Sequence, residues 1–306
     1  MGNQSSVNSL FIRGNSISPD RCRSALENAG NIVDFYNALK GKPVTPDAMK
    51  PYSIHECTID STYELGAEIG HGQYGKVFQA LRRKDKKAYV VKTQRNCVAF
   101  GREVAYMHKL DKTEVAPRLE DAYACPGNDE PFAIVMDKLK FSLWEYVVKN
   151  TTTTAKGIHR IPMGKVASIV RRCLNIRQVL RERNMTFQDW HMHNLMYDGR
   201  KWKLIDFGSA TKYDQNTMLG DLGTFTDVVV FPLFYLANVG MTQIEWDNMA
   251  GMYGDKTKEN VAHVNQQEYY TLGAKIERWY VSKFGIPNKP TLANPDFVVM
   301  KMVEMC

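Results

Sequence analysis

Two carboxylates and one amide lie close together in the middle of the 306-residue chain. Asp189 and Asn194 are five residues apart, and Asp206 follows the apolar run 202–205. Phosphoryl transfer uses these groups, because one carboxylate orients the attacking hydroxyl while an amide oxygen and a second carboxylate bind Mg²⁺. The spacing therefore predicts that Asp189 is a catalytic residue and that Asn194 and Asp206 are metal ligands.

A glycine-rich segment, GHGQYGKV at residues 70–77, precedes these groups. Its G-x-G-x-x-G spacing lets the backbone approach a phosphate group, because no Cβ stands in the way. The same spacing occurs in dinucleotide-binding folds, where a helix follows the loop. Residues 76–80 instead have the pattern of a second strand, which favours a hairpin that covers a nucleotide. The predicted nucleotide contacts of this hairpin are Gly70, His71, Gly72, Gln73, Tyr74, Gly75 and Val77.

Lys92 and Glu103 lie between the glycine-rich segment and the carboxylates. Lys92 ends the strand pattern 88–92, from which an ammonium group can reach the α- and β-phosphates of a nucleotide. Glu103 falls in the next predicted helix, where it is placed to pair with Lys92. Exposed strand lysines and solvated helix carboxylates are common, so each residue alone is a weak signal. In this order along the chain, we expect both to belong to the catalytic site.

The elements that must position these residues change character along the chain. Period-two alternation and short apolar runs predict strands at 63–69, 76–81, 87–93 and 131–136. Helical spacing of apolar residues predicts helices at 19–40, 102–110, 142–148 and 165–183. A small β-rich part followed by a larger helical part is the pattern of an α+β fold with two lobes. We predict an N-terminal extension at 1–60, a β-rich lobe with a hinge at 61–139, and a helical lobe at 140–306.

The composition is that of an ordinary globular protein, with 44% hydrophobic and 24% charged residues. The net charge of +7 is spread along the chain, and a cleft that holds triphosphate and an acidic or phosphorylated partner explains its sign equally well, so we expect no specific nucleic-acid partner. The six cysteines include no C-x-x-C pair, so we expect reduced thiols in a cytoplasmic protein. The longest apolar stretch, 228–241, is too short to span a bilayer and contains Pro232, so we expect a buried helix.

The first six residues, MGNQSS, match the pattern for attachment of myristate to Gly2. One acyl chain gives weak and reversible membrane binding, on the order of 10⁴ M⁻¹. Residues 1–18 are rich in Ser, Asn and Gly, and we expect them to be disordered. The sequence therefore predicts a cytoplasmic protein with weak membrane association through Gly2, and it makes no prediction of oligomeric state.

Together these motifs resemble those of the eukaryotic-type protein kinase superfamily, over about residues 66–208. The resemblance implies a bilobal fold with a small antiparallel β N-lobe and a larger helical C-lobe. It also implies ATP with Mg²⁺ or Mn²⁺ as cofactors and proteins as substrates. Residues that match the family's strand lysine, helix glutamate, catalytic loop and metal motif are Lys92, Glu103, Asp189, Asn194 and Asp206.

The same resemblance identifies a hinge between the two lobes. Residues 136–139 look like the family's gatekeeper and hinge, which line the adenine site. Val90 stands where the family usually has alanine beneath the adenine. The resemblance therefore adds Val90, Met136, Asp137 and Leu139 to the expected nucleotide contacts.

The chain also departs from the family pattern. Phe187 and Gln188 replace the His-Arg pair before the catalytic aspartate, so control by a phosphorylated activation loop is not expected in its usual form. His191 replaces a lysine, and no A-P-E motif follows Gly208. Residues 227–231 correspond to the family's helix αF. These departures look most like the divergent kinases of large DNA viruses or bacterial effectors, which would place the protein in a host cytoplasm.

Three functions are consistent with these residues. The leading prediction is a serine/threonine-protein kinase that depends on ATP and Mg²⁺. The second is a small-molecule phosphotransferase of the aminoglycoside or choline kinase type, because D-x-H-x-x-N at 189–194 is similar to the motif of those enzymes. The third is a catalytically weak pseudokinase that acts as a binding module. A metal site at His191 and His193 is disfavoured, since no third soft ligand is near in the sequence.

Overall fold

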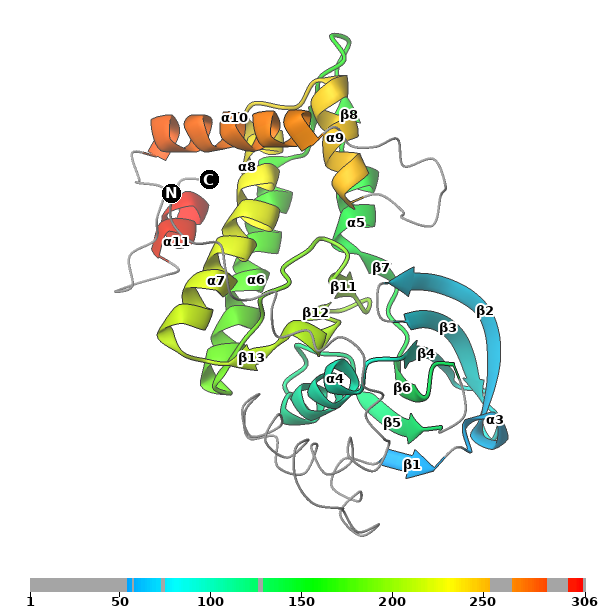
Figure 1. Ribbon diagram of the computed structural model, residues 1–306. Coiled ribbons are helices and arrows are strands. Elements are labelled where there is room, and N and C mark those ends of the chain that lie inside the picture. Colours follow the sequence, from blue (N-terminus) through cyan, green and yellow to red (C-terminus); the bar gives the residue numbers. More distant parts are fainter. Residues whose placement is uncertain are drawn as a thin grey trace.

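The computed structural model describes residues 54–56, 58–72, 75–125, 129–253, 266–284 and 297–304. A β-sheet with one packed helix forms the first lobe, and a mainly helical lobe follows it in the chain (Figure 1). This order confirms the predicted α+β fold with two lobes. The division of the chain at residues 60 and 139 stays a prediction.

Six strands form the sheet of the N-lobe, in the order β1-β5-β6-β4-β3-β2. Neighbouring strands are antiparallel, except that β1 pairs in parallel with β5. The strands are β1 (Ile54–Glu56), β2 (Tyr63–Gly72), β3 (Gly75–Arg82), β4 (Ala88–Gln94), β5 (Leu119–Ala124) and β6 (Phe132–Asp137), with the short helix α3 (Ile59–Thr62) before β2. Alternation buries Tyr89 and Val91 on one face of β4, so the sheet has its own small core.

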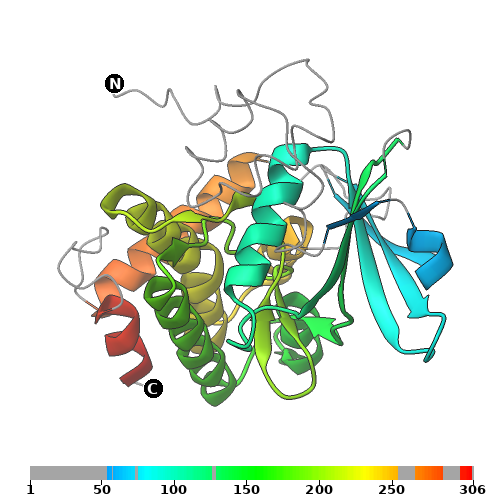
Figure 2. The same ribbon diagram turned by 90° about the horizontal axis from the view of Figure 1, so that it is seen from below.

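Helix α4 (Cys97–Lys109) lies between the sheet and the helical lobe (Figure 2). It begins five residues before the predicted start at residue 102, because the Asn96 side chain accepts a hydrogen bond from the amide of Ala99 at 3.1 Å. The helix buries Phe100, which stacks on Phe132 of β6 with ring centroids 4.9 Å apart. The packing fixes α4 against the sheet that carries Lys92.

The helical lobe contains short strands and longer helices. Its first elements are β7 (Phe141–Ser142), α5 (Leu143–Asn150), β8 (Thr152–Thr153), β9 (His159–Arg160), α6 (Met163–Glu182), β10 (Met185–Thr186), β11 (Leu195–Tyr197) and β12 (Trp202–Leu204). They are followed by η3 (Phe207–Ser209), β13 (Thr211–Lys212), α7 (Gln215–Phe225), η4 (Thr226–Val230), α8 (Phe231–Asn238), α9 (Gln243–Tyr253), α10 (Gln266–Phe284) and α11 (Phe297–Glu304). Helices α6 and α8 pack against each other, and α10 and α11 lie against them (Figure 1).

The apolar stretch near residue 230 is a buried helix, as predicted. One π-helical turn, η4, joins α7 to α8, and Pro232 sits in the first turn of α8, where its missing N–H costs nothing. Within the described residues, Gly220–Asn238 is long and apolar enough to cross a membrane by length and composition alone. In an 18-residue apolar stretch of this helix, 61% is buried inside the protein. This burial is typical of a core helix.

Several expectations fall outside the described residues. These are Gly2, the disorder of residues 1–18, the helix at 19–40, and the two hairpin residues Gln73 and Tyr74. One expectation is corrected, because Cys125 at the end of β5 is disulfide-bonded, whereas we expected reduced thiols. Cys173 of α6 is a free, buried thiol.

Candidate active site

Lys92, Glu103 and Asp206 meet where the N-lobe faces the metal motif. The Lys92 Nζ lies 2.8 Å from Glu103 Oε2 and 2.9 Å from Asp206 Oδ1. The predicted pairing of Lys92 with Glu103 is therefore present. Glu103 is 1% exposed and also accepts a hydrogen bond from buried Gln94 at 2.9 Å. The contact brings together β4, α4 and the turn after β12.

Burial and neighbouring charges shift the pKa values of Lys92 and Glu103 in opposite directions. Burial alone would lower the pKa of Lys92, but the Glu103 and Asp206 carboxylates raise it above its usual range, so the ammonium stays charged. Burial raises the pKa of Glu103, against the lowering influence of the Lys92 charge. Asp206 is 36% exposed, so it is the member of the cluster that remains open to a ligand.

The turn that carries Asp206 is held by the residues around it. Asp206 has φ 62° and ψ 65°, which is left-handed backbone that non-glycine residues seldom adopt. Phe207 is fully buried and packs edge-on against Phe187, with ring centroids 5.6 Å apart. From α4, the Arg102 guanidinium donates to the Gly208 carbonyl at 2.7 Å. A strained backbone that is fixed by packing and hydrogen bonds is typical of a functional site.

Asp189 and Asn194 contact each other across the predicted catalytic loop. The Asn194 Nδ2 donates to the Asp189 carboxylate at 2.9 Å and to its main-chain carbonyl at 3.1 Å. These bonds use the amide nitrogen, so the Asn194 carbonyl oxygen points elsewhere and can serve as a ligand. The main chain of Asn194 also accepts a hydrogen bond from Ile205, which ties this loop to the residue before Asp206.

A buried ion cluster that the sequence analysis missed lies beneath the same loop. The Arg177 guanidinium of α6 lies 2.8 Å from Asp221 of α7, and the two side chains are 1% and 6% exposed. Trp190, the residue after Asp189, donates its indole N–H to the second oxygen of Asp221. Arg177 also stacks over the ring of Phe225. The loop that carries Asp189 is thereby fixed to two helices of the C-lobe.

The region expected to match αF, residues 227–231, is helical, and the carboxylate that is buried against the catalytic loop lies before it in the chain. Asp227 is exposed at the π-helical turn, whereas Asp221, one and a half turns earlier, is buried against Trp190. Gln188 lies near the backbone of Gly220 in the same helix. His191 and His193 stack on each other with centroids 5.4 Å apart. In the described part of the chain, no group of three His, Cys, Asp or Glu residues could hold a metal by itself.

The predicted nucleotide contacts lie on one hairpin and the hinge. Gly70, His71 and Gly72 end β2, and Gly75 and Val77 begin β3, in a paired hairpin rather than a loop that opens a helix. A Cβ at Gly75 would lie 1.7 Å from the Thr93 carbonyl oxygen, so only glycine fits there. Val90 of β4 pairs in register with Met136 of β6, and Asp137 and Leu139 follow in the hinge.

The donor set fits Mg²⁺ or Mn²⁺ held together with phosphate oxygens. Asn194 and Asp206 supply an amide oxygen and a carboxylate, which are hard ligands, and they belong to two segments joined by the Asn194–Ile205 hydrogen bond. Magnesium sites of this kind use one or two carboxylates and complete their six ligands with phosphate and water. The cluster therefore fits the cofactors that the sequence predicts.

Comparison with known proteins agrees with this geometry. The protein kinase domain family matches residues 63–242, which is more than half of the chain. The chain belongs to the protein kinase family. The match includes strands β2 to β6 of the N-lobe and the helical lobe as far as α8.

Three curated relatives illustrate the match. A probable casein kinase I homologue of Encephalitozoon cuniculi is 27% identical over 158 residues, which cover 49% of this chain and 46% of that protein. The serine/threonine-protein kinase prk-2 of Caenorhabditis elegans is 28% identical over 163 residues, covering 49% and 34%. The human NUAK family SNF1-like kinase 1 is 21% identical over 196 residues, covering 60% and 28%. The chain thus spans less than half the length of these relatives.

Proposed function

We propose that the chain is a protein kinase that uses ATP and Mg²⁺ to phosphorylate serine and threonine hydroxyls of proteins. The observation that carries the proposal is the position of the Lys92 ammonium, 2.8 Å from Glu103 and 2.9 Å from Asp206. This contact joins the phosphate-binding lysine of one lobe to the metal-binding carboxylate of the other. The name of one relative, the serine/threonine-protein kinase prk-2, supports serine and threonine hydroxyls as the acceptors.

Each side chain has one role in this proposal. The Asp189 carboxylate orients the acceptor hydroxyl and accepts its proton, and Asn194 restrains that carboxylate through its amide nitrogen. Lys92 binds the α- and β-phosphates while Glu103 holds the ammonium in place. Asn194 and Asp206 would hold Mg²⁺, which supplies positive charge to the phosphate oxygens when it is bound.

The hairpin and the hinge would hold the rest of the nucleotide. The backbone of Gly70, Gly72 and Gly75 covers the phosphates, since it lacks side chains at the positions of closest approach. Val90 and Met136 lie side by side in the sheet and contact the adenine ring in this proposal. The hinge residues Asp137 and Leu139 offer backbone hydrogen bonds to its edge.

The deciding experiment is incubation of the purified chain with γ-labelled ATP and three protein substrates. These are a casein-type acidic protein, a basic protein and the chain itself, each with Mg²⁺, with Mn²⁺ and with EDTA. We expect metal-dependent label on serine and threonine after acid hydrolysis. Binding of Mg²⁺-ATP without transfer to any protein would instead indicate a pseudokinase.

A small-molecule phosphotransferase is the second candidate, and one observation favours it. Only residues 209–214 separate the metal motif from helix α7, so the segment that follows Asp206 is short. A panel of amino-alcohols and aminoglycosides, assayed beside the protein substrates, separates the two functions. Turnover of a metabolite at more than about ten times the protein rate would replace the proposal.

We also propose that the protein is cytoplasmic and that myristate on Gly2 gives it weak, reversible membrane association. The motif MGNQSS is the motivation. Fractionation of eukaryotic cells should find the wild type divided between cytosol and membrane and Gly2→Ala wholly in the cytosol. Intact-mass analysis that finds an unmodified Gly2 would remove the basis of this proposal.

A further inference from the structure

A charged hollow of about 430 Å³ lies at the hinge, and its lining includes Asp137 and Leu139, whose backbone we assign to the nucleotide. The start of β4, the hinge and the turn between β11 and β12 line it. Lys92, Glu103, Asp189, Asn194 and Asp206 are not among its lining residues. Its volume is in the range that holds a ligand or a few side chains of a peptide.

Positive charge dominates this hinge hollow. Seven of its lining residues are charged, namely Lys87, Asp137, Lys138, Lys140, Asp198, Arg200 and Lys203. Five cations and two carboxylates leave a formal charge of +3, from five minus two. An excess of one sign inside a concave surface concentrates the field and attracts the opposite charge.

Both carboxylates of the hollow are already engaged. Asp137 lies 3.7 Å from the Lys87 ammonium. Asp198 accepts hydrogen bonds from the amides of Arg200 and Lys201 at 2.6 and 2.8 Å, and it lies 3.6 Å from Lys203. Partial burial would raise the pKa of Asp198, but these amides and the Lys203 charge hold it below its usual range. The two carboxylates therefore have little capacity to neutralise the remaining cations.

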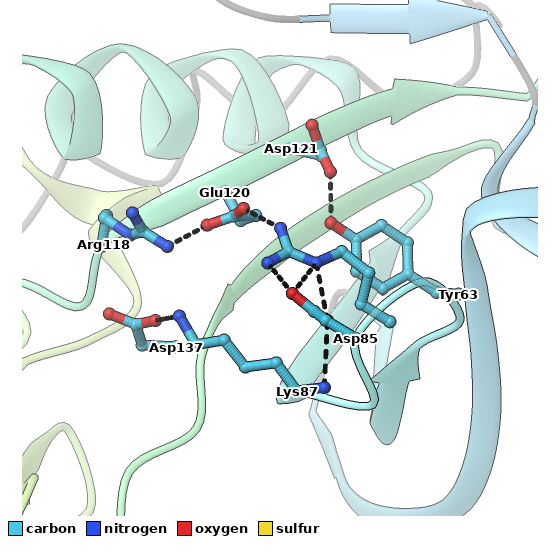
Figure 3. Close-up of polar contacts among 8 residues, drawn as sticks. Tyr63, Asp85, Lys87, Arg118, Glu120, Asp121 and Asp137 are labelled. Atoms are coloured by element: carbon cyan, nitrogen blue, oxygen red, sulfur yellow. Dashed lines mark hydrogen bonds and ion pairs between the residues drawn. The ribbon is translucent and has the colours of Figure 1, made fainter.

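Three cations of the hollow have no ion pair with any residue that the structure describes: Lys138, Lys140 and Arg200. Figure 3 shows the neighbouring surface of the N-lobe together with the Lys87–Asp137 pair of the hollow. There Arg82 lies between Asp85 and Glu120, and Arg118 also contacts Glu120. Arg82 and Arg118 are thus paired, whereas Lys138, Lys140 and Arg200 have no ion pair with any described residue.

The turn between β11 and β12 brings Gly199 next to Lys140 of the hinge. The backbone of Gly199 has φ +111°, and a Cβ there would lie 2.5 Å from the Lys140 Nζ. Lys140 therefore lies directly across a glycine whose positive φ other residues rarely adopt. The amide of Asp198 closes the turn by donating to the Lys201 carbonyl at 3.1 Å.

We propose that the hinge hollow binds an acidic segment of a protein substrate, with phosphoserine as its strongest ligand. The proposal rests on the protein kinase function proposed above, because a docked segment would bring a substrate to the site without entering the catalytic cleft. Lys and Arg side chains bind phosphate through charge-assisted hydrogen bonds. Among the described residues that line the hollow none is aromatic, which disfavours single-stranded nucleic acid, since that ligand needs rings for base stacking.

The test compares two double variants of the full chain. Lys140→Ala with Arg200→Ala removes two unpaired cations from the hollow. Lys149→Ala with Arg172→Ala removes two exposed cations from helices α5 and α6 and is the matched control. Fluorescence anisotropy measures the affinity of a labelled peptide with two phosphoserines, and circular dichroism shows that all variants are folded.

We expect the hollow variant to bind the phosphopeptide about tenfold more weakly, while the control stays within about twofold of the wild type. Binding should weaken with added salt, and saturating non-hydrolysable ATP should leave it unchanged. Equal affinity of the hollow and control variants would overturn the proposal. Displacement of the peptide by the nucleotide would also overturn it, because the hollow would then be part of the nucleotide site. Tighter competition by a single-stranded oligonucleotide of equal charge would assign the hollow to nucleic acid instead.

A kinetic arm separates this proposal from the proposed function. The hollow variant should phosphorylate a short uncharged peptide with unchanged kcat/KM, but should show a raised KM for a substrate with an acidic extension. If no protein is phosphorylated while the phosphopeptide still binds at the hollow, the kinase function fails and the binding site remains. If phosphorylation is normal and the two KM values are equal, the docking role fails alone.

Discussion

Lys92 and Arg177 are both buried cations that pair with carboxylates, yet their surroundings differ. The Lys92 cluster opens to solvent through Asp206, which is 36% exposed. The Arg177 cluster is sealed, with Arg177 1% and Asp221 6% exposed. A ligand can reach the first cluster, whereas the second contacts only protein. The first cluster is therefore suited to bind charge, and the second to hold the loop that carries Asp189.

Loss of the open carboxylate should affect activity most. In Asp206→Asn the Lys92–Glu103 contact remains, so folding should be little changed. We expect phosphoryl transfer to fall by about 10³-fold, because charge that is placed to act in the transition state is lost. Initial rates with γ-labelled ATP, together with the thermal midpoint of unfolding, measure both effects. Wild-type turnover in a folded Asp206→Asn protein would contradict the assignment of this cluster.

Loss of the sealed cation should instead affect stability first. Arg177→Met leaves the Asp221 carboxylate buried without its partner, and we expect a loss of about 3 kcal/mol in the free energy of unfolding. Urea unfolding measures this loss, and Arg172→Met on the exposed face of the same helix is the control. The double variant Arg177→Met with Asp221→Leu should regain part of the loss, because no charge is then left unpaired. A stability equal to that of the wild type in the single variant would show that the two clusters do not differ as described.

Cys173 lies one helical turn before Arg177, and its reactivity measures how well α6 stays packed around the Arg177 cluster. Burial raises the pKa of Cys173 to about 12, so roughly one thiol in 10⁴ is ionised at pH 8. Alkylation with iodoacetamide at pH 8 should leave Cys173 unmodified in the native protein and modify it in urea, as peptide mass mapping will show. In Arg177→Met the same thiol should become reactive as the helix packing loosens. Rapid alkylation of native wild type would mean that α6 opens more readily than its burial indicates.

The two clusters also differ in how far the sequence predicts them. Lys92 and Glu103 stand at positions where a strand and a helix were expected, and their contact follows from that order. Arg177 interrupts the apolar face of the amphipathic helix at 165–183. A charged residue at such a position requires a buried partner, so the sequence does indicate that Arg177 is paired. That partner, Asp221, is distant in the sequence and could not be identified from spacing. A buried pair between two helices depends on their packing.

Other differences have local causes. The strand β5 was not expected, because LEDAYA mixes carboxylates with apolar residues, and β5 becomes a strand through pairing with β1 and β6 on either side. Helix α4 was predicted too short, since the cap at Asn96 lies in a polar stretch. The hinge hollow unites the start of β4, the hinge and the β11–β12 turn, so only the folded chain brings its charges together.

We expect the smallest change in activity from phosphorylation of the segment between the two clusters. Residues 209–214 join the metal motif to α7, and they include the short strand β13, which pairs with β10. Gln188 stands beside Gly220 where the family has an arginine that binds a loop phosphate, and an amide cannot replace that charge. We therefore expect constitutive activity. Treatment with a broad phosphatase, followed by its removal, should leave the rate within about 20% of the untreated rate, since no bidentate contact to a phosphate would be lost. A severalfold drop, reversed by incubation with ATP, would show that this short segment carries a phosphorylation switch after all.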